Sequence, residues 1–328
     1  MKYLILYLCL FLSLSTAAQT IPAHDPVLIK QDSVYYMFCT GQGITVWSSV
    51  NRVDWKKEQP VFAQPPAWVL QELPAFKGHT WAPDISYHNG QYYLYYAVSA
   101  FGKNTSCIGV ATNKTLHPGS QAYHWEDRGK LVQSVPNRDD WNAIDPNLFV
   151  DNNDTAWLTF GSFWGGIKLV KLNNDLITLA HPEEWYNLAS RRPSTFRQRR
   201  TRARTDSGNT AIEAPFLFKK GNYYYLFVSV DYCCRGLKST YKVLVGRSST
   251  ITGPYVDKNN VPLMKGGGSL VAAGDSINWV AVGHNSVYTF DGKDYIVYHG
   301  YDAKDNGKPK LIIRELSWDT AGWPVVAP

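Results

Sequence analysis

The sequence has little charge, since Asp, Glu, Lys and Arg together make up 18% of its 328 residues, against about 25% in an average soluble domain. Disordered chains are rich in charge and poor in aromatic residues, so this composition excludes disorder. The bias toward Ala, Glu, Lys, Leu and Arg that marks a coiled coil is missing as well. Beyond the N-terminus no apolar run approaches the 18 or so residues of a membrane helix, and we expect no membrane partner.

Cysteine is also scarce, with five in the whole chain. Cys39, Cys107, Cys233 and Cys234 lie beyond the N-terminal segment, and none has the paired spacing of a zinc site. Four cysteines are too few for a disulfide scaffold. A bridge between the adjacent Cys233 and Cys234 would be strained, and the sequence leaves packed thiols and a redox pair both open.

The first 18 residues have the pattern of a secretory signal peptide. A basic start at Lys2 is followed by an apolar run from Tyr3 to about Leu14 and by small residues before Gln19. We therefore expect cleavage near Ala18, a single mature domain over residues 19–328, and a secreted or periplasmic location. A retained anchor is the alternative, and lipidation at Cys9 is disfavoured because no small-residue cleavage site precedes it.

What the chain does have is aromatic residues, which make up 14% of the sequence, arranged in an internal repeat. Five segments share an apolar stretch after a short polar motif, then a turn, then a second strand that is mostly Tyr-rich. The turns contain Asp, Asn and Gly, which tolerate φ > 0 and close tight hairpins. Repeats built from short hairpins, with no helical periodicity between them, predict an all-β five-bladed β-propeller, one blade per repeat. An irregular β-sandwich is the alternative.

An ungapped alignment of the five segments places five residues in one register. They are Asp25, Ala82, Asp145, Glu213 and His284. Equivalent positions on the innermost strands of a propeller surround its axis, so three carboxylates and an imidazole should converge there. Clustered carboxylates repel each other, so one keeps its proton near neutral pH while another stays ionised. Such a pair suits general acid–base hydrolysis of a glycosidic bond.

Two aromatic motifs favour a sugar as the ligand, because the apolar faces of sugar rings stack on aromatic side chains. One motif contains Trp81, and the other is the glycine-flanked segment Ser162, Phe163, Trp164. Burial between blades is the alternative role for such residues. For Trp164 the flanking glycines favour an exposed platform.

Several motifs together resemble glycoside hydrolase family 43, and within it the endo-1,5-α-L-arabinanase branch. The similarity runs from about residue 22 to residue 325. The motifs are His24-Asp25-Pro26, Trp81-Ala82-Pro83-Asp84, Asn142-Ala143-Ile144-Asp145-Pro146, Gly161-Ser162-Phe163-Trp164-Gly165-Gly166, Ile212-Glu213-Ala214-Pro215, Asp231-Tyr232-Cys233-Cys234-Arg235-Gly236 and Ser239-Thr240-Tyr241.

The resemblance implies a five-bladed propeller that cleaves internal α-1,5-L-arabinofuranosidic bonds of arabinan with inversion. It implies that Asp25 is the general base, Glu213 the general acid, and Asp145 the residue that tunes the pKa of Glu213. His284 matches the family's axial histidine, beside which calcium or another ion is often bound, largely through waters. The chemistry itself requires no cofactor. The resemblance also implies a set of substrate-binding residues, which are Asn142, Ala143, Ile144, Ser162, Phe163 and Trp164. The aromatic platform described above adds Trp81.

The connection at residues 191–209 departs from the family pattern, because seven arginines lie between Arg191 and Arg204. A solvated loop tip is one interpretation and attraction to acidic pectin, from which arabinan hangs, is another. A fold of this loop over the groove would shift cleavage toward an exo mode or abolish it. The arginines also account for the net charge of +6, which is therefore no sign of nucleic-acid binding.

Three other functions remain in competition. An exo-acting α-L-arabinofuranosidase or a β-xylosidase of the same family would use the same carboxylates. A propeller that binds glycans without cleaving them is disfavoured by the intact set of Asp25, Asp145 and Glu213. A nucleic-acid-binding module is disfavoured by export. We expect a polysaccharide as the only partner and a monomeric protein.

Overall fold

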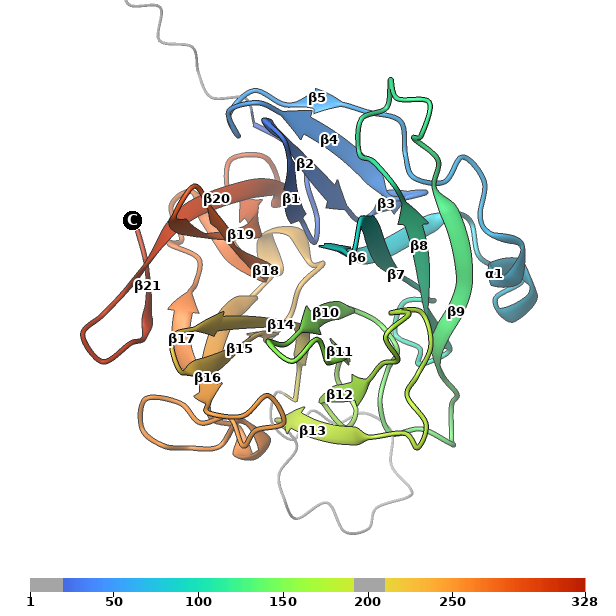
Figure 1. The fold of residues 1–328 in the computed structure, drawn as a ribbon. Coiled ribbons are helices and arrows are strands. Elements are labelled where there is room, and N and C mark those ends of the chain that lie inside the picture. Colours follow the sequence, from blue (N-terminus) through green and yellow to red (C-terminus); the bar gives the residue numbers. More distant parts are fainter. Residues whose placement is uncertain (1–19, 192–209, 328) are drawn as a thin grey trace, which may run out of the picture.

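The protein, described here by a computed structural model over residues 20–191 and 210–327, is built from five antiparallel sheets. The sheets surround one axis as the blades of a propeller (Figure 1). This confirms the predicted five-bladed β-propeller. The predicted signal peptide and most of the arginine-rich loop lie outside the described residues. Among the described residues no helix is long and apolar enough to cross a membrane.

The strands of each blade follow one another from the axis outward. Blade 1 consists of β1 (Val27–Gln31), β2 (Val34–Cys39), β4 (Thr45–Ser49) and β5 (Lys56–Lys57). Blade 2 consists of β6 (His79–His88), β7 (Gln91–Val98), β8 (Ser106–Asn113) and β9 (Glu126–Ser134), with β3 (Gly41–Gln42) paired to the inner edge of β6. Blade 3 consists of β10 (Asn147–Val150), β11 (Ala156–Phe160), β12 (Ile167–Lys171) and β13 (Trp185–Ala189).

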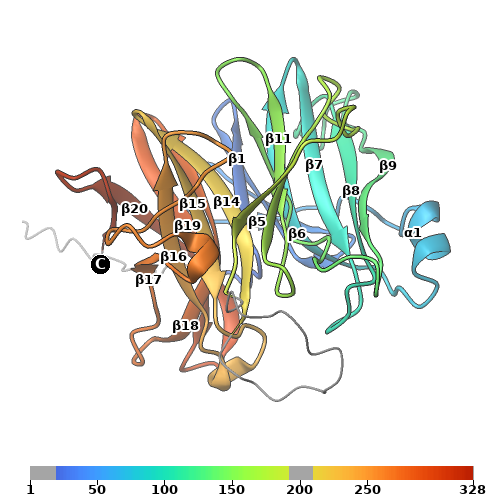
Figure 2. The ribbon, with the colours of Figure 1, turned by 90° about the horizontal axis from the view of Figure 1, so that it is seen from below.

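The last two blades follow the same order. Blade 4 consists of β14 (Ile212–Lys220), β15 (Tyr223–Val230), β16 (Lys242–Ser248) and β17 (Ser269–Ala272). Blade 5 consists of β18 (Trp279–Phe290), β19 (Lys293–Asp302), β20 (Lys308–Trp318) and β21 (Pro324–Val326). Three short helical segments lie between strands: α1 (Ala67–Glu72), η1 (Gly236–Lys238) and η2 (Leu263–Lys265). Figure 2 shows the blades from the side, with the innermost strands running roughly along the axis.

The Tyr-rich strands fill the spaces between neighbouring blades. Along β7, Tyr92, Leu94 and Tyr96 pack into the core shared with blade 1, whereas Tyr93 and Tyr95 face the core shared with blade 3. This alternation is the two-residue period of a strand buried on both faces. The aromatic excess in the sequence is therefore the material of the cores between blades.

The ring is closed by the N-terminal segment, which pairs with the last blade. The Leu311 N–H donates to the Ile21 carbonyl at 2.9 Å, and the Ala23 N–H donates to the Pro309 carbonyl at 3.3 Å. Both contacts use the part of β20 that β21 leaves uncovered, since β21 pairs only with Leu316–Trp318. The two ends of the described chain therefore share one sheet edge, and Asp25 follows directly after the segment that closes the ring.

The register predicted for blade 4 is wrong by one residue. Each innermost strand has a residue with positive φ either within it or two positions before it, and this residue is Ala214 in blade 4, not Glu213. Strand pairing agrees, because the β-bulge begins at Trp81 in blade 2, at Glu213 in blade 4 and at Gly283 in blade 5. Glu213 is thus equivalent to the residue before the left-handed position. The left-handed residues of the five blades are Asp25, Ala82, Asp145, Ala214 and His284.

Side chains along the axis also fasten one blade to the next. The carboxylate of Asp84 accepts a hydrogen bond from the Leu148 N–H at 2.8 Å, and Asn147 accepts one from the Leu217 N–H at 2.9 Å. Asp84 and Asn147 occupy the same position in successive blades. Burial raises the pKa of Asp84 to about 7, although its hydrogen bonds from Leu148 and Asn147 oppose the shift. An ionised Asp84 is therefore unfavourable in the folded state.

This position yields a prediction for Asp84→Asn. The folded-state pKa of Asp84 lies above its ordinary value of 3.8, so the wild type loses stability as pH rises from about 4 to about 7. The variant has no carboxyl to ionise, and Asn147 shows that an amide can make the same inter-blade bond. The unfolding free energy of the variant minus that of the wild type should therefore be about 2–3 kcal/mol larger at pH 8 than at pH 5.

Urea unfolding curves of both proteins at the two pH values measure this change. Subtracting one protein from the other removes the titration of all other groups. A difference that stays constant with pH would show that Asp84 is ionised in the folded protein at little cost.

Candidate active site

Asp25 lies at the start of β1, buried at the end of the axis where the innermost strands begin. Three side chains hold its carboxylate. His284 Nδ1 lies 2.9 Å from Oδ1, His24 Nδ1 lies 2.8 Å from Oδ2, and the Thr40 hydroxyl donates to Oδ2 at 2.5 Å. Every one of these partners favours the ionised carboxylate.

The pKa of Asp25 reflects these contacts. Burial by itself raises the pKa, but the imidazoles of His24 and His284 outweigh it through charge and hydrogen bonds, and the pKa falls well below 3.8. Burial likewise lowers the pKa of His284, yet Asp25, Asp145 and Glu213 raise it to about 9. Asp25 is thus a carboxylate and His284 an imidazolium at neutral pH.

Glu213 comes from β14, across the axis, and has a different environment. Its Oε2 accepts a hydrogen bond from the Ser162 hydroxyl at 2.9 Å. Burial raises the pKa of Glu213, and the negative charge of Asp25 adds to the effect, while the hydroxyls of Ser162 and Tyr241 and the charge of His284 oppose it. No cationic side chain forms a salt bridge with Glu213 among the described residues. Burial therefore favours the protonated form of Glu213.

Asp145 connects the two sides of the site. Its Oδ2 accepts a hydrogen bond from the N–H of Ala214, the residue after Glu213, at 3.0 Å. Burial raises the pKa of Asp145 to about 8; His284 opposes the shift, and the charges of Glu213 and Asp25 add to it. The charge of Glu213 thus acts on Asp145, and Asp145 binds the backbone that follows Glu213.

The four predicted ionisable residues therefore meet at one end of the axis. Asp25 and His284 are in direct contact, and Asp145 and Glu213 interact electrostatically with both. The two imidazoles favour the ionised form of Asp25, whereas burial favours the protonated forms of Glu213 and Asp145. An ionised base beside a protonated acid is the arrangement that general acid–base catalysis requires.

An aromatic rim borders this site on the side of blades 3 and 4. Phe163 and Trp164 are partly exposed, and both have positive φ, at 49° and 37°. Two successive left-handed residues other than glycine are strained, and such strain clusters at ligand-binding positions. The Phe163 ring lies 6.4 Å from that of Tyr232. Trp81, also partly exposed, donates from Nε1 to His79.

The other predicted substrate-binding residues lie closer to the protein interior. Asn142 is buried and its Oδ1 accepts a hydrogen bond from the Ser106 hydroxyl at 2.6 Å. Ala143 is buried as well, and Ile144 is the register equivalent of Glu213 in blade 3. Ser162 contacts Glu213. A direct contact of these residues with substrate stays a prediction, and what the structure adds is that Ser162 holds the carboxyl of Glu213.

The predicted ion near His284 was tested against the donors present. Calcium is held by six to eight oxygens, whereas the ring of His284 offers nitrogen and its Nδ1 already contacts Asp25. The neighbouring Asn285 is buried, and neither atom of its amide has a partner among the described residues. The protein atoms do not form a calcium cage, so waters would have to supply most of the ligands. The ion stays a prediction, and the chemistry below does not use it.

Sequence reasoning missed His299, which lies on β19, the second strand of blade 5, and Thr40, which directly follows β2. His299 Nδ1 accepts a hydrogen bond from the Asp25 N–H at 3.1 Å, and Thr40 both donates to Asp25 and accepts from the Ala82 N–H at 2.8 Å. A signal exists in the sequence. Both residues, and Ser229 in blade 4, lie 16 positions after the residue that precedes the left-handed one.

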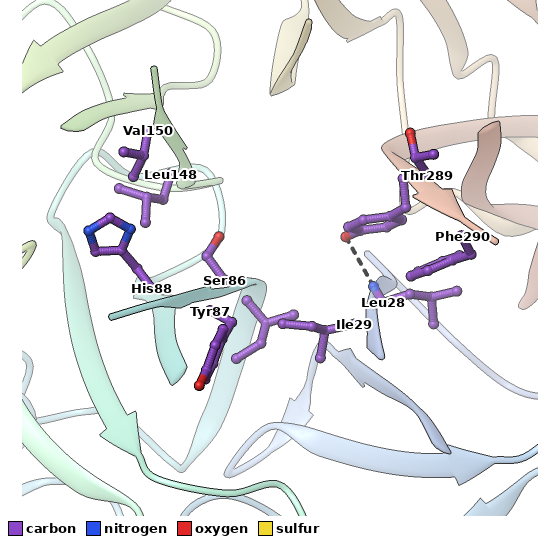
Figure 3. Close-up of a pocket in the computed structure, with 11 residues that line it drawn as sticks. Leu28, Ile29, Ser86, Tyr87, His88, Leu148, Val150, Thr289 and Phe290 are labelled. Atoms are coloured by element: carbon purple, nitrogen blue, oxygen red, sulfur yellow. Dashed lines mark hydrogen bonds between the residues drawn. The ribbon is translucent and has the colours of Figure 1, made fainter. Parts of the chain in front are cut away.

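A cavity of about 290 Å³ lies farther along the axis, and Figure 3 shows the residues that line it. Its residues come about four positions, or about 13 Å, later along the innermost strands than those of the site. The lining contains Leu28, Tyr87, Leu148 and Phe290, and the Tyr288 hydroxyl accepts a hydrogen bond from the Leu28 N–H at 3.0 Å. No carboxylate lines this cavity, so the acid–base chemistry does not belong to it.

Comparisons with known proteins identify the family of the chain. A model described as glycosyl hydrolases family 43 matches residues 20–324. The chain is 50% identical, over 96% of its length and 89% of the relative, to "extracellular exo-alpha-(1->5)-L-arabinofuranosidase ArbA" of Cellvibrio japonicus. It is 40% identical, over 92% of its length and 86% of the relative, to "extracellular endo-alpha-(1->5)-L-arabinanase 1" of Bacillus subtilis.

A solved structure gives the same result. The α-L-arabinanase of Cellvibrio cellulosa, complexed with arabinohexaose, superposes with a TM-score of 0.89 at 50% identity. The alignment covers 94% of this chain and 96% of that one. With the acid–base pair at the axis and the family model spanning the described propeller, the chain belongs to glycosyl hydrolases family 43.

Proposed function

We propose that this protein hydrolyses α-1,5-linked L-arabinofuranosyl bonds of arabinan with inversion at the anomeric carbon. The observation that carries the proposal is the opposite effect of the site on two buried carboxyl groups. The pKa of Asp25 is held low and that of Glu213 is raised. Similarity to relatives named for arabinan supports the choice of substrate.

In the proposed reaction Asp25 removes a proton from water as the water attacks the anomeric carbon. Glu213 gives its proton to the departing sugar oxygen on the other face, and the bond to that oxygen breaks. An inverting pair needs its carboxyl groups about 6.5–9.5 Å apart to admit the water. Different partners hold the two groups, with Asp25 bound to His24, His284 and Thr40 and Glu213 to Ser162.

Asp145 has the role of a modulator in this scheme. Its own pKa of about 8 is raised in part by the charge of Glu213, so each carboxyl favours the proton on the other. Near neutral pH the pair retains at least one proton. The Ala214 N–H on Asp145 fixes the adjacent backbone, so the protonated carboxyl keeps its orientation.

The mode of attack has two candidates. Sequence motifs favour endo cleavage, as named for the Bacillus relative at 40% identity. The Cellvibrio japonicus relative at 50% identity is named as an exo enzyme, and this higher identity favours release from chain ends. Debranched arabinan separates the modes, since an exo enzyme releases one short product from the start and an endo enzyme a ladder of oligomers.

The same reaction tests the activity and its stereochemistry. Proton NMR of the first turnover should show the β-anomer, which inversion of an α-bond requires. A protein that binds arabinan and releases no sugar would be the non-catalytic propeller. Both relatives are named extracellular, and we propose export through the N-terminal segment. We also propose a monomer acting on arabinan that is free or attached to pectin.

The first prediction concerns Glu213→Ala. General acids contribute about 10²- to 10⁴-fold, so kcat on arabinan should fall at least about 100-fold. An aryl arabinoside with a nitrophenolate leaving group needs no protonation, so its loss should be much smaller. Asp25→Ala is the matched control, since loss of the base should reduce both rates alike. Full activity of Glu213→Ala on arabinan would refute the mechanism.

The second prediction concerns the pH profile of kcat/KM. The Ser162 hydroxyl favours the ionised form of Glu213, so Ser162→Ala should raise the pKa of Glu213 and shift the alkaline limb to higher pH. The Thr40 hydroxyl favours ionised Asp25, so Thr40→Val should shift the acidic limb upward. Measuring both limbs in both variants gives the answer. If Ser162→Ala shifted the acidic limb and Thr40→Val the alkaline limb, Glu213 would be the base and Asp25 the acid.

The third prediction concerns Trp164→Ala. Trp164 is partly exposed in a strained loop beside Glu213 and Ser162, so its ring is placed to stack on a sugar. KM for arabinan should rise about tenfold, the range expected for loss of one such contact. The thermal unfolding midpoint should change little. Trp157→Phe, in the core between blades, is the control, with KM retained and stability reduced.

A further inference from the structure

The disulfide loop, defined as residues 231–236, lies at the rim of the site and has no role in the reaction described above. The structure joins Cys233 and Cys234 in a disulfide, which decides the question the sequence left open, whereas Cys39 and Cys107 are buried free thiols. Cys234 is exposed, and its Sγ lies 3.7 Å from His24 Nε2. The loop therefore contacts the imidazole that holds the base Asp25.

The loop is fixed at both of its ends. Asp231 forms ion pairs with Arg191 and with Lys242, each at 2.7 Å. The Arg235 N–H donates to the Ser239 hydroxyl at 3.1 Å. Between these ends Cys234 has a φ of 64°, in the left-handed region that a non-glycine residue adopts only when its surroundings impose it. The disulfide and the two tethers impose this conformation, which directs the Cys234 N–H toward blade 5.

The Tyr301 hydroxyl on β19 receives that N–H at 2.8 Å. His299 Nε2 and His24 Nε2 each lie 3.2 Å from the same oxygen. His299 Nδ1 accepts from the Asp25 N–H, so its own proton is on Nε2 and points at Tyr301. Two donors then occupy the lone pairs of the hydroxyl. The Tyr301 proton is left for His24.

This arrangement of protons sets the tautomer of His24. When Nε2 accepts the proton of Tyr301, Nδ1 carries the ring proton and donates to Asp25 Oδ2 at 2.8 Å. The ring is also stacked on His299, with centroids 4.2 Å apart. Stacking fixes the plane of His24 and leaves a ring flip possible. The hydroxyl of Tyr301 adds to the preference for the orientation that presents N–H to the base, because a flipped ring would turn carbon atoms toward both Asp25 and Tyr301.

We propose that Tyr301 is a positioning residue for the base Asp25, acting through His24, and that the disulfide loop holds the Tyr301 hydroxyl in place. This inference rests on the proposed role of Asp25. The geometry assigns Tyr301 no contact with substrate, so its loss should affect the chemical step and leave binding intact.

The test begins with Tyr301→Phe in the mature protein. On debranched arabinan kcat should fall about 10- to 100-fold, the effect of a slight misplacement of a catalytic group, while KM stays within about twofold. Tyr95→Phe is the matched control, because it also removes a buried tyrosine hydroxyl. The hydroxyl of Tyr95, in blade 2, donates to the Leu176 carbonyl. Tyr95→Phe should lower stability and leave kcat unchanged. An unchanged kcat in Tyr301→Phe, or a change in KM alone, overturns the proposal.

The disulfide provides the second arm, by double-mutant cycle. The Cys233→Ser/Cys234→Ser double variant should lower kcat in the wild-type background and have little further effect in the Tyr301→Phe background, because both changes break one linkage. Dithiothreitol, which forms its own cyclic disulfide as it reduces Cys233–Cys234 to two thiols, repeats the test on folded wild type. Independent, multiplying effects on kcat would show that the loop does not act through Tyr301.

His24→Asn separates this inference from the proposed function. Asparagine can still donate to Asp25, but its shorter side chain has no atom at the position of His24 Nε2, so in this background Tyr301→Phe should change kcat less than twofold. A large further loss overturns the proposed linkage. The role of Asp25 is judged separately, by whether Asp25→Ala abolishes turnover. If Asp25→Ala keeps its turnover, the proposed role of Asp25 is wrong, whatever the result for Tyr301→Phe.

Discussion

The active site depends on the capture of one backbone N–H at the start of each innermost strand. In four blades this N–H belongs to the left-handed residue and is bound by a side chain of the preceding blade. The pairs are Asp25 with His299, Ala82 with Thr40, Ala214 with Asp145, and His284 with Ser229. An unpaired buried N–H is costly, so each bond fixes a blade to its neighbour at the level of the chemistry. The site is precise because the same atoms hold the ring together.

The pKa values of the buried Asp25 and Glu213 shift in opposite directions because the partners of the two carboxyl groups differ. Both Asp25 and Glu213 are removed from water, which by itself favours protonation. Asp25 has two imidazoles, and their charge and hydrogen bonds outweigh burial. Glu213 has hydroxyls and the negative charge of Asp25, and burial prevails. The propeller supplies the burial to every residue at its axis, and the neighbours of each residue decide its charge.

The fold could be predicted from sequence because its signals are local. Turn residues such as Asn89 and Asp291 close hairpins between apolar and Tyr-rich strands, and they take the positive φ expected of them. The convergence of Asp25, Asp145, Glu213 and His284 followed from the repeat. The register of blade 4 did not, because an ungapped alignment matches carboxylates and not backbone conformations. The X-Pro pairs Asp25-Pro26 and Ala214-Pro215 would have given the correct register.

The partners of the carboxylates could not be predicted in the same way. His299 and Tyr301 lie on the second strand of blade 5, and Thr40 directly follows the second strand of blade 1. Ser162 lies in a loop of another blade from Glu213. Their roles depend on which neighbouring blade their side chains reach, and that follows only from the closed ring. Even the 16-residue spacing to Thr40 and His299 has meaning only after the left-handed residues are known.

The one-residue offset of Glu213 explains how a repeated backbone carries unlike chemistry. The position before the left-handed residue holds His24, Trp81, Ile144, Glu213 and Gly283 in the five blades. Gly283 leaves room for a neighbour, since a Cβ there would lie 2.0 Å from the ring of Tyr241, which lines the Glu213 side of the site. The proposed base therefore comes from one register position and the proposed acid from the position before it, on different blades. If the same ionisable residue were repeated at either position, like charges would surround the axis. The backbone is nearly symmetric, but its side chains are not. This asymmetry allows the site to favour the ionised form of one carboxyl group and the protonated form of the other.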